Sequence, residues 1–284
     1  MKRKNNQNHS CLRGGGRAVA YLILALHGFL TLFPLYIMIV TSLKENKEIF
    51  HSPFALPSSF RWESYEKVLR LNDFATYFRN SIFVTGISVV LFVVVSLLAA
   101  YALGRFRFRG NGALYIYFLL GMMVPIRLGV INMFDTFNKL KLNDTLLGLV
   151  CIYTAMSIGF SVFIMTGFMR GLPVEIEESA KIDGCSRFRI LWNILVPVLK
   201  PAIATAVIYN FVPIWNDFYF PLIFIQSENL KTLPIGVTIF FGQYQTDWPT
   251  VFAALTLAAL PVLIFYFLMS KQFIKGLTAG AVKG

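Results

Sequence analysis

Six long apolar stretches constrain this chain more than any other feature of its sequence. They lie at residues 18–40, 81–103, 113–134, 145–168, 201–225 and 251–270. A helix needs roughly 20 apolar residues to cross a hydrocarbon core about 30 Å thick, because lipid cannot satisfy backbone polar groups. With 56% hydrophobic and 14% charged residues, the chain of 284 residues is also too apolar for an ordinary soluble domain. The sequence therefore predicts an all-α membrane protein with six transmembrane helices.

The positions of the basic residues predict how these helices are oriented. Of the 26 Lys and Arg residues, 16 lie on one side, in segments 1–17, 104–112, 169–200 and 271–284. Nine lie on the opposite side, and Arg127 lies within a span. Because basic loops are retained in the cytoplasm, we expect a protein of the inner or plasma membrane of a prokaryote, with both termini cytoplasmic. Segments 1–17 and 271–284 would be tails of a transmembrane domain at 18–270, and the net charge of +12 would reflect topology rather than a nucleic-acid partner.

The connection between the fourth and fifth stretches, residues 169–200, is longer than a tight turn requires. Pro173 suits the first position of a helix. Glu175, Glu177 and Glu178 follow it and place negative charge where the helix dipole is positive. A short cytoplasmic helix is therefore expected to begin near Pro173.

A turn and a second helix are expected after it. Gly184 suits the left-handed residue that closes a helix. An amphipathic stretch then covers residues 186–196, and Pro197 and Pro201 are expected to interrupt the chain before the fifth span. The sequence thus predicts a helix-turn-helix beneath the membrane, between spans four and five.

This segment also carries a recognisable motif. Glu178-Ser-Ala-Lys-Ile-Asp-Gly184, followed after nine residues by Ile194-Leu-Val-Pro197, resembles the EAA loop of ABC importer permeases. The family form is Glu-Ala-Ala, three residues, Gly, nine residues, then Ile-x-Leu-Pro. The chain matches it at Glu178, Ala180, Gly184, Ile194 and Pro197. It departs from it at Ser179 and Val196, which are small or conservative changes.

Three further segments extend the resemblance over nearly the whole chain. Tyr101-Ala-Leu-Gly-Arg-Phe-Arg-Phe-Arg-Gly110 is similar to the exit of the second span in the oligosaccharide branch of carbohydrate uptake permeases. Trp215-Asn-Asp-Phe218 resembles a Trp-Asn-(Asp or Glu)-Phe segment of their fifth span. The end of the chain, Lys275-Gly-Leu-Thr-Ala-Gly-Ala-Val-Lys-Gly284, resembles the C-terminus of the smaller permease subunit of maltose-type importers.

The resemblance implies a permease subunit of a binding-protein-dependent ABC importer, forming half of the translocation pore for a sugar or oligosaccharide. It implies three kinds of protein partner besides membrane lipid: a second homologous permease in a heterodimer, two ABC ATPase subunits and an extracytoplasmic solute-binding protein. The residues implied to couple the permease to the ATPase are Glu178, Ser179, Ala180, Asp183, Gly184, Ile194 and Pro197. A purely local interpretation stays open, with Glu178 as a partner of the helix dipole and Gly184 as a helix cap.

Motifs for catalysis or nucleotide binding are absent from the sequence. It contains no Gly-x-x-x-x-Gly-Lys-[Ser/Thr] motif and no Gly-Lys dipeptide at all. ATP and Mg²⁺ would therefore be used by the partner ATPase, and we expect no cofactor or metal bound directly. No His-Glu-x-x-His or Gly-x-Ser-x-Gly motif occurs either, so no catalytic residue is expected. The alternatives are an intramembrane enzyme and an autonomous secondary transporter, which would leave the EAA-like loop unexplained.

Several polar side chains are expected at membrane depth, where they are costly unless they face the bundle interior or a water-filled path. The candidates for a translocation pathway are Arg127, Tyr153, Thr154, Ser157, Asn210, Asn216 and Asp217. The neutral members would hydrogen-bond sugar hydroxyls. A structural ion pair or an interfacial position would equally explain Arg127 and Asp217, and hydrogen bonds between helices would explain the others.

Overall fold

The computed structural model describes residues 6–70, 72–241 and 246–281, and every regular element in this part of the chain is a helix. The all-α class expected from the sequence is therefore confirmed. The chain divides into two compact units. The first comprises Met1–Arg70 and Phe240–Leu257, and the second comprises Leu71–Ile239 and Ala258–Gly284.

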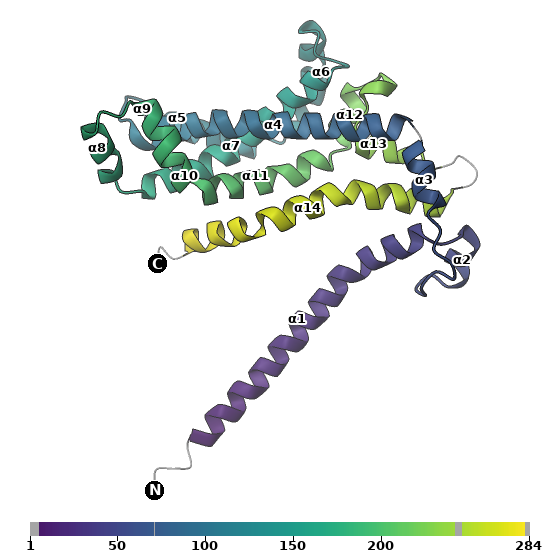
Figure 1. Ribbon diagram of the computed structural model, residues 1–284. Helices are drawn as coiled ribbons and strands as arrows, with labels where there is room; N and C mark the ends of the chain where they lie inside the picture. The colour runs from purple at the N-terminus through teal and green to yellow at the C-terminus, as the bar shows by residue number, and fades with distance from the viewer. Residues whose placement is uncertain (1–5, 71, 242–245, 282–284) are drawn as a thin grey trace. The chain divides into compact units, whose positions relative to one another are not determined.

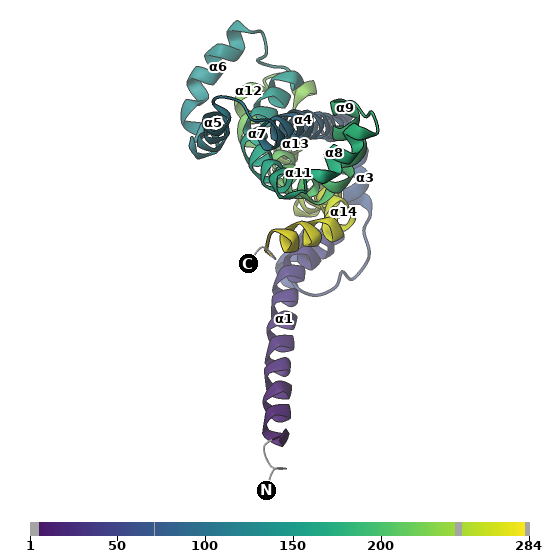
Figure 2. The same ribbon diagram turned by 90° about the vertical axis from the view of Figure 1, so that its left-hand side faces the viewer.

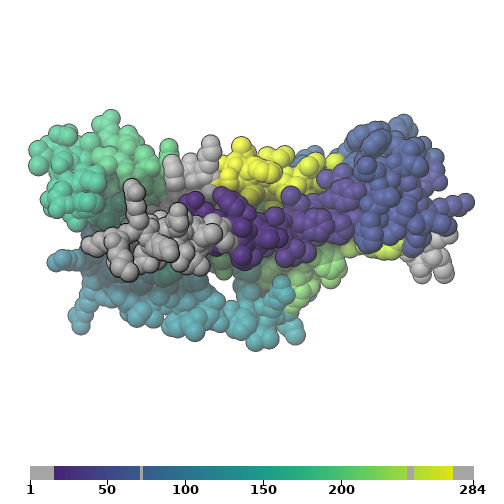
Figure 3. Space-filling view, turned by 90° about the horizontal axis from the view of Figure 1, so that it is seen from below, coloured from purple at the N-terminus to yellow at the C-terminus, as the bar shows by residue number. Residues whose placement is uncertain are grey.

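The first unit begins with three helices, α1 (Asn6–Ser42), α2 (Asn46–His51) and α3 (Glu63–Arg70). The described apolar side chains of α1 are mostly exposed, which suits a helix that lipid surrounds, and Figure 3 draws the described part of this helix in purple. Lys44, just beyond α1, is buried, and its Nζ donates a hydrogen bond of 2.7 Å to the carbonyl oxygen of Ser52. The buried lysine thus joins the residues on either side of α2.

The start of α14 (Trp248–Ala281) completes the first unit. Asp247 Oδ2 lies 3.0 Å from Lys67 Nζ of α3 and accepts a hydrogen bond of 2.8 Å from Thr250 Oγ1. Burial raises the pKa of the Asp247 carboxyl, but the hydrogen bonds from Lys67 and Thr250 outweigh it and hold this pKa below its usual range. The ion pair thus joins α3 to the start of α14.

Three helices form the centre of the second unit: α4 (Asn72–Arg105), α7 (Leu146–Gly171) and α11 (Lys200–Trp215). They lie side by side in both views of the ribbon (Figures 1 and 2), and α5 (Asn111–Met123) packs on α7. Small residues permit this close packing. A Cβ atom on Gly104 would lie 2.8 Å from Met169 Cγ, and one on Gly159 would lie 2.6 Å from Met122 Cγ.

Four helices are long and apolar enough to cross a membrane. They cover Gly16–Ser42, Asp73–Arg105, Leu146–Gly171 and Trp248–Ser270. Two bent pairs reach the same length only together: Asn111–Met123 with Ile126–Lys139, bent by 81°, and Arg187–Val198 with Lys200–Trp215, bent by 73°. The described residues therefore hold four candidate spans, or six if each bent pair counts as one.

The third expected span, residues 113–134, is not one continuous helix. Helix α5 ends at Met123, and the chain continues after Pro125 as the 3-10 helix η1 (Ile126–Gly129) and then as α6 (Val130–Lys139). Proline lacks an N–H group, and its ring clashes with the preceding helical turn. Pro125 therefore accounts for the break.

The fifth expected span, residues 201–225, also ends early. Helix α11 stops at Trp215, and α12 (Tyr219–Phe224) follows as a separate short helix. Asp217 lies between them, and its Oδ2 accepts a hydrogen bond of 3.0 Å from the N–H of Phe220. The carboxylate thus satisfies one of the free N–H groups at the start of α12.

Asp144 joins two loops of the second unit. Its Oδ1 accepts hydrogen bonds of 2.9 Å from the N–H groups of Gln226 and Ser227, and the Ser227 hydroxyl donates to Oδ2. Hydrogen bonds from Ser227 hold the pKa of the Asp144 carboxyl below its usual range. The second of these loops leads into the 3-10 helix η3 (Glu228–Leu230) and α13 (Leu233–Thr238).

Candidate functional site

The motif found in the sequence begins on the short helix α8 (Glu175–Ile182), which starts two residues after Pro173. Glu177 and Glu178 both lie in the first turn of α8, where negative charge is favoured by the helix dipole. The two side chains have opposite surroundings, because Glu178 is exposed and Glu177 is buried. The helix dipole favours both carboxylates in the same way, so the difference in their burial must come from tertiary packing.

Helix α8 ends with a glycine in the left-handed conformation. Gly184 has a φ of 77°. Its N–H donates to the carbonyl of Lys181, and the N–H of Cys185 donates to the carbonyl of Ala180, both at 3.0 Å. These two bonds form a Schellman motif, which satisfies carbonyl groups that the end of a helix leaves free.

The second helix of the connection contains a π-helical turn that the sequence did not predict. Ser186 caps α9 (Arg187–Ile190), and η2 (Leu191–Leu195) and α10 (Val196–Val198) follow. The N–H of Val196 donates to the carbonyl of Leu191, five residues back. The helix continues through Pro197 to Val198, and the chain then bends by 73° before α11 begins at Lys200, so the expected interruption lies between Pro197 and Pro201.

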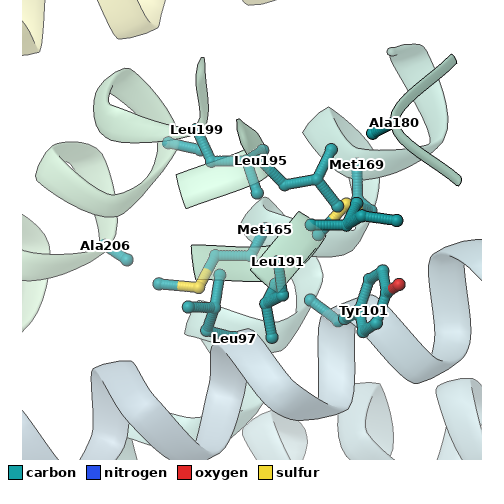
Figure 4. Close-up of a cluster of buried hydrophobic side chains, with 12 residues drawn as sticks. Leu97, Tyr101, Met165, Met169, Ala180, Leu191, Leu195, Leu199 and Ala206 are labelled. Carbon is teal, nitrogen blue, oxygen red and sulfur yellow. The ribbon is translucent and has the colours of Figure 1, made fainter. Parts of the chain in front are cut away.

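Ala180 anchors α8 in a buried apolar cluster of the second unit. Figure 4 shows it at the edge of this cluster beside Met169 of α7, with Tyr101 of α4 and Leu191 and Leu195 of η2. Each of these side chains is buried. The cluster therefore joins α8 to the long helices α4 and α7.

The other motif residues divide between an exposed face and the helix that follows. Glu178, Ser179, Asp183 and Gly184 are exposed, and beside them lie two exposed apolar side chains, Ile182 (86% exposed) and Phe188 (69% exposed). Ile194 is half-buried and Pro197 is exposed. Ala180 therefore holds the helix in place, while the exposed residues Glu178, Ser179 and Ile182 of α8 are accessible to another molecule.

A buried ion pair, which sequence reasoning missed, locks α8 to the end of α4. Arg105 Nε contacts Glu177 Oε1, and the two side chains are only 7% and 4% exposed. Arg105 Nη2 also donates to the carbonyl of Leu172 (3.1 Å), and Arg170 Nη2 donates in return to the carbonyl of Leu103 (3.3 Å). These contacts thus join the ends of α4 and α7 to the start of α8.

A second feature is a cavity of about 620 Å³ between α7, η1 and the end of α11, called the polar cavity below. It brings together six of the seven polar residues that the sequence placed in a pathway: Arg127, Tyr153, Ser157, Asn210, Asn216 and Asp217. The seventh, Thr154, is next to Tyr153 on α7 but does not line the cavity. Polar side chains from separate parts of the sequence therefore meet in one place.

The two charged residues of the polar cavity have different partners. The Tyr153 hydroxyl donates a hydrogen bond of 2.7 Å to Asp217 Oδ2. The Arg127 guanidinium lies over the ring of Tyr219, 4.9 Å from its centroid. In the described ranges no ion pair joins Arg127 and Asp217, and each charge has its own separate contact.

The neutral residues of the polar cavity also bond to the helices that carry them. Ser157 Oγ donates to the carbonyl of Tyr153 (2.8 Å), and Asn210 Nδ2 donates to the carbonyl of Ala206 (2.8 Å). Asn210 Nδ2 also lies 3.4 Å from Ser161 Oγ of α7, which joins α11 to α7. Throughout the described ranges, no group of three or more His, Cys, Asp or Glu residues could hold a metal ion.

Comparison with known proteins matches residues 92–278 to a family described as the binding-protein-dependent transport system inner membrane component. The ABC transporter permease protein ORF2 of Caldicellulosiruptor sp. (strain Rt8B.4) is 41% identical over 265 residues, which cover 93% of this chain and 96% of that protein. The probable starch degradation products transport system permease protein AmyC of Thermoanaerobacterium thermosulfurigenes is 35% identical over 250 residues, covering 88% and 91% of the two chains.

A solved structure shares the fold. It is the crystal structure of a bacterial ABC transporter involved in the import of the acidic polysaccharide alginate. One of its chains matches with a TM-score of 0.81 and 23% sequence identity, covering 92% of this chain and 97% of that chain. The helical arrangement is therefore that of an ABC transporter permease.

Proposed function

This chain belongs to the family of binding-protein-dependent transport system inner membrane components, and from this premise we propose that it is a permease subunit of an ABC importer for a sugar or oligosaccharide. The observation that carries the proposal is the family match over residues 92–278, which includes both the motif segment and the polar cavity. The substrate class follows the starch-product permease that is 35% identical. The chain is a multi-pass membrane component of transport rather than an enzyme.

We propose that the chain crosses the membrane six times, with the bent pair Asn111–Met123 and Ile126–Lys139 as the third span and residues 201–225, which hold most of α11 and all of α12, as the fifth. Both termini and residues 169–200 would lie in the cytoplasm, on the side that carries most of the lysine and arginine residues. Residues 18–270 would form the transmembrane domain. Broken spans suit this role, because non-helical backbone is tolerated at membrane depth where it lines a cavity.

Helix α8 is the proposed contact with an ABC ATPase, which uses ATP and Mg²⁺. Its exposed residues Glu178 and Ile182, with Phe188 of the neighbouring helix α9, offer a carboxylate and apolar surface. Carboxylates form their strongest pairs with arginine, so Glu178 is expected to meet a basic residue of the ATPase. The ion pair of Arg105 and Glu177 then passes a displacement of α8 to α4 and α7, since a packed body moves as a unit.

The polar cavity is the proposed contribution of this subunit to the translocation pathway. It combines hydroxyl, amide and carboxylate groups with the aromatic rings of Tyr153, Tyr209 and Phe220, and such groups can hydrogen-bond sugar hydroxyls while ring faces cover the apolar side of a sugar. A second homologous permease would complete the pore, and a solute-binding protein outside the membrane would deliver the substrate.

Uptake measurements test the substrate class. A strain that lacks this gene should lose the accumulation of one radiolabelled carbohydrate from a panel of mono- and oligosaccharides, and the intact gene should restore it. Unchanged uptake of every carbohydrate in the panel, together with lost uptake of another solute, would overturn the sugar proposal while leaving the importer intact.

Charge reversal tests the contact with the ATPase. Glu178→Lys should abolish uptake with normal membrane insertion, because it places a cation opposite the expected basic residue. Glu175→Lys is a matched control, since Glu175 is also exposed in the same first turn and lies outside the motif. Both changes cost about the same interaction with the helix dipole, roughly 0.3–1 kcal/mol, so equal losses of uptake would count against a specific role for Glu178.

A further inference from the structure

A second cavity, of about 570 Å³, lies between the end of α4, residues 106–108, α8 and the start of α9, and is called the basic cavity below. Its charged lining consists of Arg105, Arg107, Lys181, Arg187 and Glu177. Four cations thus surround a space that contains a single carboxylate.

Three of these cations lack a carboxylate partner. Glu177 is already paired with Arg105. In the described ranges, Arg107, Lys181 and Arg187 form no ion pair, and the Arg187 guanidinium lies over the Phe106 ring, 5.1 Å from its centroid. Like charges held near one another repel, so the basic cavity has a positive potential that an anion would relieve.

The walls of the basic cavity are fixed before any ligand arrives. The pair of Arg105 and Glu177 holds α8 against α4. Asn111 Nδ2 donates to the carbonyl groups of Leu103 (3.2 Å) and Phe106 (2.8 Å), which shapes the loop, and Gly110 has a φ of 91° that only glycine adopts readily. A preorganised site spends less free energy on ordering when a ligand binds.

The position of the basic cavity along the chain places it at the membrane surface. Arg105 is the last residue of the candidate span Asp73–Arg105, and the next apolar helix, α5, begins at Asn111. Phe108 and Val174 line the cavity and are themselves exposed. The cavity therefore opens where an apolar span ends, at the depth of lipid phosphate groups, with apolar side chains at its rim.

We infer that the basic cavity binds a phosphate group, which Arg107, Lys181 and Arg187 hold together. Guanidinium groups bind phosphate through paired hydrogen bonds, and lysine adds a point charge. The source is the headgroup of an anionic phospholipid of the inner leaflet or a soluble phosphate compound, and this inference rests on the proposed cytoplasmic orientation. A bound phosphate would bridge the loop after α4 to α8 and α9, and so would steady the helix that meets the ATPase.

The test compares two double variants of the assembled transporter. Arg107→Ala with Arg187→Ala removes two cations of the basic cavity. Arg109→Ala with Arg189→Ala removes two cations from the same loop and helix, each two residues further along, that do not line the cavity. Both variants lower the net charge equally, so general attraction to an anionic membrane changes equally.

Retention of phosphatidylglycerol is measured by native mass spectrometry after reconstitution in phosphatidylcholine with phosphatidylglycerol. The cavity variant should retain this lipid about 30-fold more weakly than the control variant, since each direct bond from a cation to the phosphate contributes about fivefold. The control variant should lose only the general attraction that both variants lose. Equal losses in both variants, or no loss in either, would overturn a lipid site.

A second arm separates the two sources. Inorganic phosphate and glycerol phosphate are added to the assemblies in pure phosphatidylcholine, and the melting temperature is followed. Stabilisation of the wild type and the control, but not of the cavity variant, would assign the site to a soluble phosphate. If neither arm distinguishes the cavity variant from its control, the phosphate site is refuted, whether or not sugar uptake supports the proposed function.

Discussion

Neutralising Glu177 should loosen α8 from the body of the permease. Glu177→Gln keeps the size of the side chain but leaves the Arg105 guanidinium buried without its carboxylate. The guanidinium cannot lose its proton at accessible pH, so the charge persists in a site that is 7% exposed. The variant therefore exchanges a paired buried charge for an unpaired one.

The expected loss of stability is large for a single substitution. Removing one partner of a buried ion pair costs about 3–5 kcal/mol, and we expect the lower end because Arg105 keeps its hydrogen bond to the carbonyl of Leu172. A loss of about 3 kcal/mol lowers the melting temperature of a chain of this size by roughly 6–12 °C. Uptake driven by ATP should fall as well, because α8 no longer moves with α4.

The assay is thermal unfolding of the purified permease in detergent, followed by tryptophan fluorescence, with uptake measured in parallel. Glu178→Gln is the control, because this neighbour is exposed and has no ion pair in the described structure. The control should melt like the wild type, although its contact with the ATPase should weaken. Glu177→Gln therefore reports on the stability of the permease, and Glu178→Gln reports on its contact with the ATPase.

A double variant completes the experiment. Arg105→Gln with Glu177→Gln removes both charges, so it should be more stable than the sum of the two single losses by about 0.5–3 kcal/mol. If Glu177→Gln melts at the wild-type temperature, or if the two substitutions are simply additive, the buried pair does not hold α8 in place.

Three further predictions address other parts of the structure. Gly184→Val should lower the free energy of unfolding by about 1–2 kcal/mol, because a φ of 77° strains any side chain although nothing lies within 4 Å of the new Cβ. It should also reduce copurification of the ATPase. Unchanged copurification would rule out a role of Gly184 in the contact with the ATPase. Asp217→Asn and Tyr153→Phe should each reduce uptake about tenfold, because each removes the same charge-assisted hydrogen bond. Uptake by the double variant should be no lower than uptake by either single variant. Additive losses of uptake would show that the two groups act separately. The pKa of the Asp144 carboxyl is lowered in the folded protein, so this residue stabilises the fold fully above the usual carboxyl pKa of about 4 and less as the pH falls through the folded pKa. The melting temperatures of the wild type and Asp144→Ala should therefore differ at neutral pH and converge in acid. A difference that stays constant with pH would contradict this.

The apolar pattern of the sequence predicted the straight helices well and the broken ones poorly. Residues 145–168 correspond closely to α7 (Leu146–Gly171). Residues 113–134 and 201–225 are also long apolar stretches, yet the first is bent after Met123 and the second is divided after Trp215. Hydropathy measures whether a segment suits lipid, and it does not report the direction of the backbone, so the bend at Pro125 needed the separate chemistry of proline.

The candidate sites show the same division between local and tertiary information. The polar cavity was within reach of sequence reasoning, because polar residues such as Tyr153 and Asp217 are costly in a span unless they share an interior space. The pair of Arg105 and Glu177 was not, because each residue already had a local explanation, as a topology signal and as a partner of the helix dipole. Only packing brings these distant charges together.

Copurification tests the central claim most directly. The tagged chain is extracted gently from its native membrane, and its partners are identified and quantified by mass spectrometry. The importer proposal predicts an ABC ATPase at two copies and a second multi-span permease at one copy for each copy of this chain. A chain that purifies alone and still transports its substrate would contradict the account.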